Sequence, residues 1–150
     1  MKMLVCVDGS EQSKRALEKA AMIAEGCGAN EVAIIHVYDH SQDMTRIASY
    51  KELTVEEVEK FKNMVEKHKE DQKKILEDAL KFFEEKNIKA RTIFREGHPA
   101  REIVSVACEE EFDLIVLGSR GLSGLQRIFL GSVSSAVIQQ AKNSDVLTVK

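Results

Sequence analysis

Short strand-like segments alternate with helix-like segments along the whole chain, and this alternation restricts the fold more than any other feature. The strand-like segments cover residues 3–7, 32–38, 90–94, 114–117 and 146–149. Most of them are continuous apolar runs, which are typical of strands covered on both faces. The alternation predicts an α/β fold, with a five-stranded parallel sheet, helices on both faces and right-handed crossovers. Residues 90–94 alternate between polar and apolar side chains, so we expect that strand at an edge of the sheet.

The segments between these strands have the apolar spacing of amphipathic helices. Helices are predicted from about residue 13 to the glycines at 26 and 28, over 55–86, from Pro99 onward, and over about 132–142. The helix that begins at Pro99 is expected to turn Ile103, Val104 and Ala107 toward the sheet.

The helix over 55–86 is unusually long for a crossover. Its inward stripe, in steps of three and four residues, is Val58, Phe61, Val65, His68, Gln72, Ile75, Ala79 and Phe82. Two of these positions are polar, so burial is expected to weaken there. At 1.5 Å per residue the helix would be ~48 Å long, so its first turns should project beyond the sheet or break. Residues 39–54 show no period, and we therefore treat 39–74 as a long connection with an extended helix.

Composition excludes several classes of function. With 150 residues and a formal net charge of −3, we expect one domain over residues 1–150 and no nucleic-acid partner, which would need a basic face. Cys6, Cys27 and Cys108 are too widely spaced to suggest a disulfide framework or a zinc site. No signal peptide and no apolar run near ~20 residues is visible, so we expect a cytoplasmic protein without a membrane partner.

A glycine-rich segment directly follows the apolar run at 114–117. It reads Gly118-Ser-Arg-Gly121, and Gly131-Ser132 follows ten residues after the second glycine. A strand that opens into such a loop and then into a helix commonly holds phosphate. Glycine lets backbone N–H groups approach the anion, and the helix amino end adds unpaired donors.

The first strand ends in a second candidate loop, Asp8-Gly9-Ser10, which offers a turn and an N-cap. In open α/β sheets, ligands lie beyond the carboxyl ends of the strands, at the point where the strand order reverses. If the first and fourth strands flank that point, this loop and the glycine-rich segment face each other across one crevice.

With these two segments, the chain resembles the universal stress protein family, and more specifically its ATP-binding branch. The strong signal is Gly118-x2-Gly121-x9-Gly131-Ser132, which occurs together with Val7-Asp8-Gly9-Ser10. Weaker support comes from Ile35-His36-Val37, Gly97-x-Pro99 and Val146-Leu147-Thr148-Val149. The resemblance implies a flavodoxin-like strand order 3-2-1-4-5 and a homodimer formed through the last strand, residues 146–149. It also implies ATP bound between the first and fourth strands.

The resemblance further implies roles for individual residues. Asp8 would contact the nucleotide on its adenosine side or through a metal such as Mg²⁺, and the Val37 backbone would meet adenine. The first two glycines would wrap the ribose and phosphates, and residues 131–133 would hold the phosphate tail. The candidate ligand-binding residues are Asp8, Gly9, Ser10, Val37, Gly118, Ser119, Arg120, Gly121, Gly131, Ser132, Val133 and Ser134.

The chemistry of these side chains agrees with the resemblance. Ser132 can cap the helix and donate its hydroxyl to a phosphate oxygen. Arg120 and Arg127 can supply the positive charge that a triphosphate needs. Asp8 would be repelled by bare phosphate, so its partner is expected to be a ribose hydroxyl, an adenine amine or a bound Mg²⁺.

Plainer interpretations stay open beside these. Gly131-Ser132 can be only a helix start, and Asp8 can be only a cap. His36 is expected to be a core histidine bonded to the backbone. His98 can line the crevice or lie in an ordinary turn, and Ser123 and Ser134 can touch phosphate or simply belong to the loop.

Several hypotheses of function follow. The first is a regulatory, stress-response module in which bound ATP changes the dimer, the exposed connection or the affinity for an unidentified protein partner. The second is an enzyme on the same fold, either a slow ATPase or a nucleotidyl transferase. A third, disfavoured by the complete glycine set, is a dimerisation partner with an empty or AMP-filled pocket. The chain has no G-x-x-x-x-G-K-[ST] motif and no recognisable nucleophile motif, which favours the first. Residues 39–74 can form either a lid over the nucleotide or a partner-docking arm, and the loop at about 40–54 is expected to become ordered when the nucleotide binds.

Overall fold

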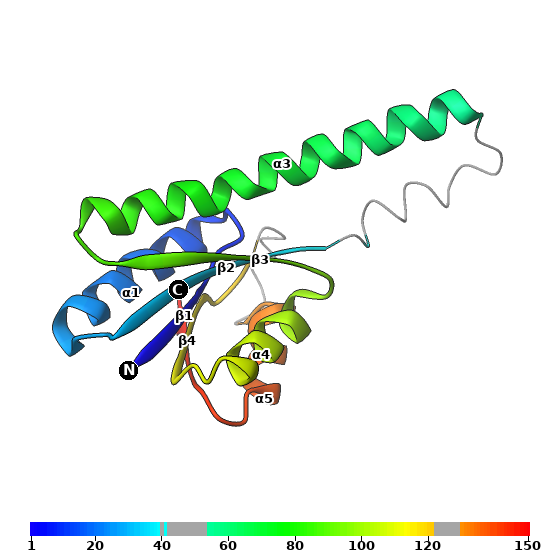
Figure 1. Cartoon of the computed structure of the whole chain (residues 1–150). Coiled ribbons are helices and arrows are strands. Elements are labelled where there is room, and N and C mark those ends of the chain that lie inside the picture. The colour runs from blue at the N-terminus through cyan, green and yellow to red at the C-terminus, as the bar shows by residue number, and fades with distance from the viewer. Residues whose placement is uncertain (40, 42–53, 122–129) are drawn as a thin grey trace.

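The computed structural model describes residues 1–39, 41, 54–121 and 130–150, which form a five-stranded parallel sheet with helices on both faces (Figure 1). In chain order the elements are β1 (Lys2–Cys6), α1 (Glu11–Cys27), β2 (Glu31–Tyr38), α3 (Val55–Glu85), β3 (Ala90–Glu96), α4 (Pro99–Glu109), β4 (Leu114–Gly118), α5 (Ser132–Gln140) and β5 (Asp145–Val149). The strand order is β3-β2-β1-β4-β5, and each neighbouring pair is parallel. The predicted fold class and strand order are therefore confirmed, and the order reverses between β1 and β4.

Both faces of the sheet are buried, as the continuous apolar runs predict. Alternate residues of β1 point to opposite sides. Met3 and Val5 pack under α1 and α3, whereas Leu4 and Cys6 pack under α4 and α5. Figure 1 shows the same two layers, with α1 and α3 on one side of the sheet and α4 and α5 on the other.

The helix α1 begins two residues earlier than the apolar stripe alone suggests. Ser10 is its N-cap, and the Ser10 hydroxyl oxygen accepts the Ser13 N–H at 3.1 Å. This cap, offered by the turn after β1, fixes the start at Glu11. At the other end Gly28 adopts φ +62°, a left-handed conformation that glycine takes without a steric penalty.

The helix α3 is continuous from end to end, so of the two expectations the projection is confirmed and the break is wrong. A capping box starts it: Thr54 Oγ1 accepts the Glu57 N–H at 3.3 Å, and Glu57 Oε2 accepts the Thr54 N–H at 2.8 Å. The amino-terminal half extends beyond the sheet (Figure 1). The buried side chains, Leu76, Ala79 and Phe83, all lie in the carboxyl-terminal half.

Of the predicted inward stripe of α3 only Ala79 is buried, and Val58 and His68 are exposed. Leu76 and Phe83 are buried, whereas the predicted Ile75 and Phe82 are only half-buried. Steps of three and four residues average 3.5 per turn, and such a stripe drifts by ~20° per heptad around a straight helix. The sheet lies under only the last turns, so burial there depends on which side of α3 faces the sheet, and Leu76, Ala79 and Phe83 lie on that side.

A similar correction applies to α4. Pro99 occupies the first turn as predicted, and Ile103 and Ala107 are buried. Val106 is fully buried and the predicted Val104 is only half-buried, because Val106 lies on the same side of the helix as Ile103.

The outer strands of the sheet also match the sequence pattern. β3 is an edge strand with half-buried and exposed residues, as its alternation predicts. β5 forms the opposite edge. Within the described segments, no helix combines the length and apolarity that a bilayer crossing requires.

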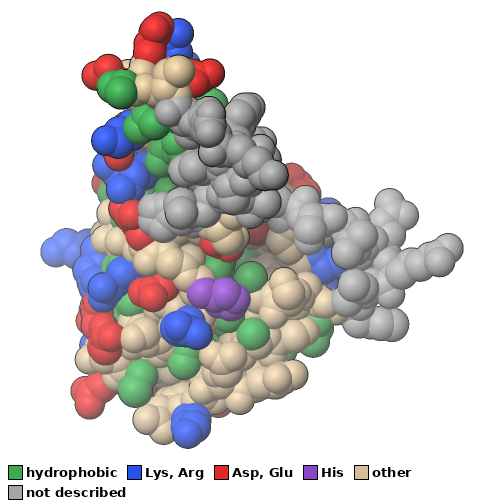
Figure 2. Space-filling model, turned by 90° about the vertical axis from the view of Figure 1, so that its right-hand side faces the viewer, with side chains coloured by type: hydrophobic (Ala, Val, Ile, Leu, Met, Phe, Trp, Pro, Cys, Tyr) green, Lys and Arg blue, Asp and Glu red, His purple; other side chains and the backbone are tan. Residues whose placement is uncertain are grey.

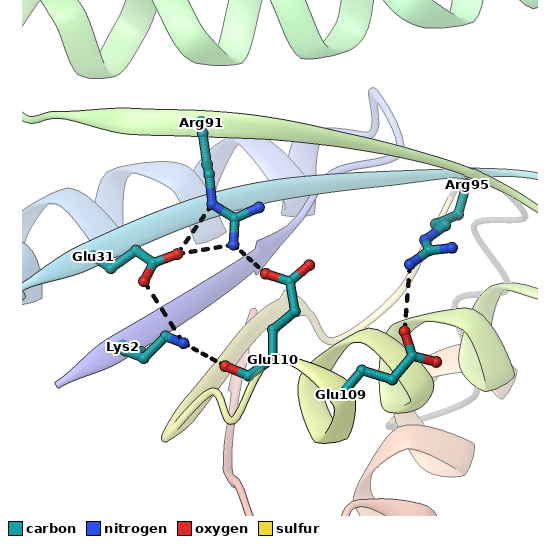
Figure 3. A network of polar contacts seen from close by, with 6 residues as sticks. All are labelled: Lys2, Glu31, Arg91, Arg95, Glu109 and Glu110. Carbon is teal, nitrogen blue, oxygen red and sulfur yellow. Dashed lines mark hydrogen bonds and ion pairs between the residues drawn. The ribbon is translucent and has the colours of Figure 1, made fainter.

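A polar network ties the amino ends of three strands to α4 (Figure 3). Arg91 of β3 donates from Nε and Nη2 to Glu31 Oε1 of β2, at 3.0 and 2.8 Å. The same guanidinium pairs with Glu110, and Lys2 of β1 lies 3.6 Å from Glu31 Oε2. These contacts lie at the end of the sheet opposite to the carboxyl ends of the strands. They therefore stabilise the fold and are not part of the candidate site.

Candidate functional site

A cavity of about 340 Å³ lies at the carboxyl ends of β1, β2 and β4, where the strand order reverses. This volume lies within the range of small-molecule sites. Among its lining residues are these members of the predicted site: Asp8, Val37, Gly118, Arg120, Gly121, Gly131, Ser132, Val133 and Ser134. The other three predicted residues, Gly9, Ser10 and Ser119, do not line it and instead shape the two loops.

The loop after β1 holds Asp8 in a fixed orientation. Asp8 Oδ1 accepts the Ser10 N–H at 2.9 Å, which closes a tight turn. Gly9 supplies the φ of +79° that this turn requires, and a Cβ there would lie 3.2 Å from Ile75 Cδ1 of α3. The remaining carboxylate oxygen, Oδ2, faces Gly121 across the switch point, the place between β1 and β4 where the strand order reverses. Asp8 is therefore not the N-cap of α1, since that position belongs to Ser10.

The three spaced glycines allow three different close approaches. A Cβ at Gly118 would lie 2.9 Å from Gln12 Cβ, so this glycine lets α1 pack against the end of β4. A Cβ at Gly121 would lie 2.7 Å from Asp8 Oδ2, and one at Gly131 would lie 3.3 Å from Arg120 Cα. The three glycines therefore allow close packing around the loop, and they also leave space for a ligand.

The amino end of α5 differs from the prediction in one respect. Gly131, not Ser132, is the N-cap, and no side chain caps the helix. Ser132 is the first helical residue, one position past the N-cap, so its hydroxyl does not form the predicted cap. A glycine N-cap leaves the N–H groups of the first turn without a side-chain partner, and these donors lie at the cavity.

Ser119 and Ser134 connect the loop to α5 and β5. The Ser119 N–H donates to Val149 O, and the Gly131 N–H donates to Ser119 O, each at 2.7 Å. The Ser134 hydroxyl also donates to Ser119 O, at 2.9 Å. Ser134 lines the cavity, but its hydroxyl is engaged by the loop itself.

Three buried polar atoms around the site have no hydrogen-bond partner among the described residues: His36 Nε2, Ser119 Oγ and Arg120 Nε. Buried polar groups are normally paired, so such atoms need an explanation. The His36 ring is bonded to the backbone as predicted, with Nδ1 2.8 Å from Val7 O. Arg120 and His36 both line the cavity, where a bound molecule would supply partners.

The electrostatics of the cavity are mixed. Arg120 brings positive charge near the amino end of α5, whereas Asp8 and Asp39 bring carboxylates. Burial, and then the charge of Asp8, raise the pKa of the Cys6 thiol well above its ordinary range, so Cys6 is an inert wall residue. On the described part of the face shown in Figure 2, acidic and basic side chains are interspersed.

The cavity has further walls that sequence reasoning did not assign to the site. They include Tyr38 at the end of β2 and Asp39 after it, His68 and Gln72 on α3, and Pro99 and Ile103 on α4. A signal for two of them was present, because His68 and Gln72 interrupt the apolar stripe of α3. His98 is exposed and does not line the cavity; it is the N-cap of α4 without a side-chain cap bond.

Some predictions fall on residues outside the described part of the chain. They concern the charge of Arg127, a phosphate contact by Ser123, and most of the connection over 40–54. Within the described ranges, no group of three or more His, Cys, Asp or Glu residues could hold a metal ion by itself.

A model of the universal stress protein family matches residues 1–150. The chain belongs to the universal stress protein family. Universal stress protein YxiE of Bacillus subtilis is 41% identical over 142 residues, covering 92% of this chain and 91% of that protein. The solved structure of MJ0577 from Methanocaldococcus jannaschii has a TM-score of 0.81 at 33% identity, covering 99% of this chain and 94% of that one.

A solved family member in complex with cAMP has a TM-score of 0.68 at 25% identity, covering 100% of this chain and 97% of that one. That relative binds a nucleotide, and its fold is similar to the fold found here. The predicted resemblance is thus confirmed at the level of the family.

Proposed function

We propose that this protein binds ATP in the cavity between β1 and β4 and acts as a regulatory module of the stress response. The observation that carries the proposal is the convergence, on one cavity, of the uncapped amino end of α5, Gly121 and Gly131, and Arg120 with its unpartnered buried Nε. Helix amino ends bind anions through N–H groups and the positive end of the helix dipole, and arginine adds charge-assisted bonds. A family member in complex with cAMP supports a nucleotide as the ligand.

The charges around the cavity suggest how the nucleotide lies. Its phosphates fit the amino end of α5 beside Arg120. Asp8 fits a ribose hydroxyl or a Mg²⁺ ion that the phosphates also hold, because Mg²⁺ is commonly bound by one or two carboxylates together with substrate phosphates. The described residues offer no metal cluster of their own, so Mg²⁺ would arrive with ATP.

The proposal includes a cytoplasmic homodimer formed through β5. This strand is an edge of the sheet with half-buried Val146, Leu147 and Val149, and an open edge readily pairs with another strand. The loop bond from Ser119 N–H to Val149 O links that edge to the glycine-rich segment. Nucleotide binding would therefore act on a loop that is anchored directly to the dimer strand.

The first experiment is to denature the freshly purified protein and to identify any released nucleotide by chromatography and mass spectrometry. We expect near-stoichiometric ATP, and ATP binding in titration that Gly131→Val weakens strongly. Gly26→Val is the matched control, because a Cβ at Gly26 meets nothing within 4 Å. Release of ADP or AMP alone would instead point to turnover, and the absence of any nucleotide binding would overturn the proposal.

A further inference from the structure

The helix α3 forms one wall of the cavity at the two positions where its apolar stripe is interrupted. His68 and Gln72 lie one turn apart on the same side of the helix, and both line the cavity. Their Nε2 atoms are 3.3 Å apart and hydrogen-bonded. If the Gln72 amide donates its N–H to the His68 ring, its oxygen is left as an acceptor. The two polar residues thus lie where the helix passes over the cavity instead of over the apolar core.

The end of β2 completes this wall. Tyr38 is buried, and its ring meets the His68 ring edge-on, with centroids 5.7 Å apart. His36 lies two residues earlier, on the same side of β2. The His36 Nδ1 faces a carbonyl oxygen, Val7 O, so Nδ1 carries the hydrogen and the unpartnered Nε2 is an acceptor. The wall therefore combines an aromatic surface with two acceptors.

This end of the cavity does not suit phosphate. Asp39, which follows Tyr38, is a lining residue, and its carboxylate, whose Oδ1 accepts the Ser41 N–H at 2.9 Å, adds negative charge that disfavours phosphate. The nearby cations of α3 are already paired, since Lys69 forms an ion pair with Glu96 and Lys73 lies 2.6 Å from Glu70 Oε1. The uncapped amino end of α5 and Arg120 bind the phosphates instead. The wall formed by His68 and Gln72 of α3 with the end of β2, which we call the α3 wall, is then left for the base.

We propose that the base of the nucleotide binds against this wall and that Gln72, positioned by His68, selects a purine that carries a 6-amino group. The inference rests on the proposed nucleotide-binding function. The acceptors His36 Nε2 and Gln72 Oε1 pair with the N–H groups of a 6-amino substituent. A 6-oxo substituent would place a third acceptor against them and leave them unpaired, which weakens binding.

The test compares ATP with ITP, in which a 6-oxo group replaces the 6-amino group and the ring nitrogen N1 carries a hydrogen, by titration calorimetry. The wild-type protein should bind ATP roughly five- to tenfold more tightly than ITP, the worth of about one net hydrogen bond. Gln72→Leu and His68→Leu should weaken ATP binding by a similar factor and leave ITP binding within about twofold. Gln72→Glu keeps an acceptor oxygen, so it should retain the preference for ATP.

The matched control is Lys67→Leu, which changes an exposed neighbour on the same helix that does not line the cavity. It should leave both affinities unchanged. An unaltered ratio of ATP to ITP affinity in Gln72→Leu and His68→Leu would overturn the inference while the nucleotide site stands. Equal weakening of ATP and ITP binding in these variants would also overturn it, because the two side chains would then support the cavity without recognising the 6-amino group. Wild-type protein that binds neither ligand would overturn the proposed function, and this inference with it.

Discussion

The carboxylate of Asp8 lies so close to Gly121 that a Cβ atom at residue 121 would stand 2.7 Å from Asp8 Oδ2. The other oxygen of the same carboxylate accepts the Ser10 N–H at 2.9 Å. One side chain thus spans the switch point, with the loop after β1 on one side and the loop after β4 on the other. Gly121 is therefore needed to give Asp8 its position as well as to let a ligand approach.

The first prediction concerns this contact. Gly121→Ala should lower ATP affinity by roughly tenfold or more, because the new methyl group displaces the Asp8 carboxylate from the cavity. Thermal stability should stay within about 1 kcal/mol of wild type, since only the end of one side chain must move. Titration calorimetry and thermal denaturation measure the two effects. Gly26→Ala, which meets open space within 4 Å, is the control, and equal ATP affinity in both variants would contradict the prediction.

The second prediction separates the two roles of Asp8. Asp8→Asn keeps an oxygen to accept the Ser10 N–H, so the turn should survive. The charge that would hold Mg²⁺ is lost, so adding Mg²⁺ should strengthen ATP binding in the wild-type protein and much less in the variant. Titrations with Mg²⁺ and with EDTA measure this difference. If Mg²⁺ helps both proteins equally, Asp8 contacts the nucleotide without a metal.

The order of elements and the position of the cavity could be predicted from the sequence because they depend on local patterns. Apolar runs define buried strands, and in a parallel sheet all carboxyl ends meet at one edge. Asp8 and Gly121, far apart in the chain, are thereby brought together. The family resemblance added the strand order, which the local patterns alone do not decide.

The details that failed depend on tertiary packing. Ser132 was predicted as a cap because serine is a favoured N-cap, but the chain enters α5 one residue earlier, where Gly131 packs against Arg120. The α3 wall was not predicted because nothing in a single helix pattern tells which polar residue lies over a cavity. The interruption of the apolar stripe at His68 and Gln72 can be seen in the sequence. Only the position of β2 beside α3 shows that these two residues line a cavity.

The third prediction concerns the free edge of the sheet. The N–H of Asp145 and the carbonyl of Val149 both bond to atoms on the β4 side. Backbone groups alternate in direction along a strand, so those of Val146 and Thr148 point away from β4 toward the open edge. Thr148→Pro removes one outward donor and leaves the bonds to β4 intact.

If the dimer forms through β5, Thr148→Pro should shift the protein from dimer to monomer in sedimentation or light-scattering measurements. Thr148→Val keeps the backbone donor and should remain dimeric, which makes it the matched control. A wild-type protein that is monomeric, or a Thr148→Pro variant that dimerises as tightly as wild type, would exclude this interface.

The fourth prediction concerns the network at the other end of the sheet. Hydrogen bonds from Arg91, and then the charges of Lys2 and Arg91, lower the pKa of Glu31. A carboxylate whose pKa is lower in the folded state contributes stability above its unfolded pKa, and this contribution is lost as the pH falls through the folded pKa. Arg91→Ala removes the main cause, so the variant should be less stable at neutral pH, and the deficit should shrink below about pH 4.

The size of this effect is limited by solvent, because the side chains of Arg91 and Glu31 are 43% and 35% exposed. We expect a loss of less than about 1 kcal/mol in the free energy of unfolding at pH 7, and a smaller loss at high salt. Denaturant unfolding at pH 7, 5 and 3 measures it. Arg95→Ala is the control, since Arg95 pairs with Glu109 at 3.4 Å and is not among the groups that shift Glu31. A deficit in Arg91→Ala that stays constant from pH 7 to pH 3 would show that the arginine stabilises the sheet by packing rather than by its charge.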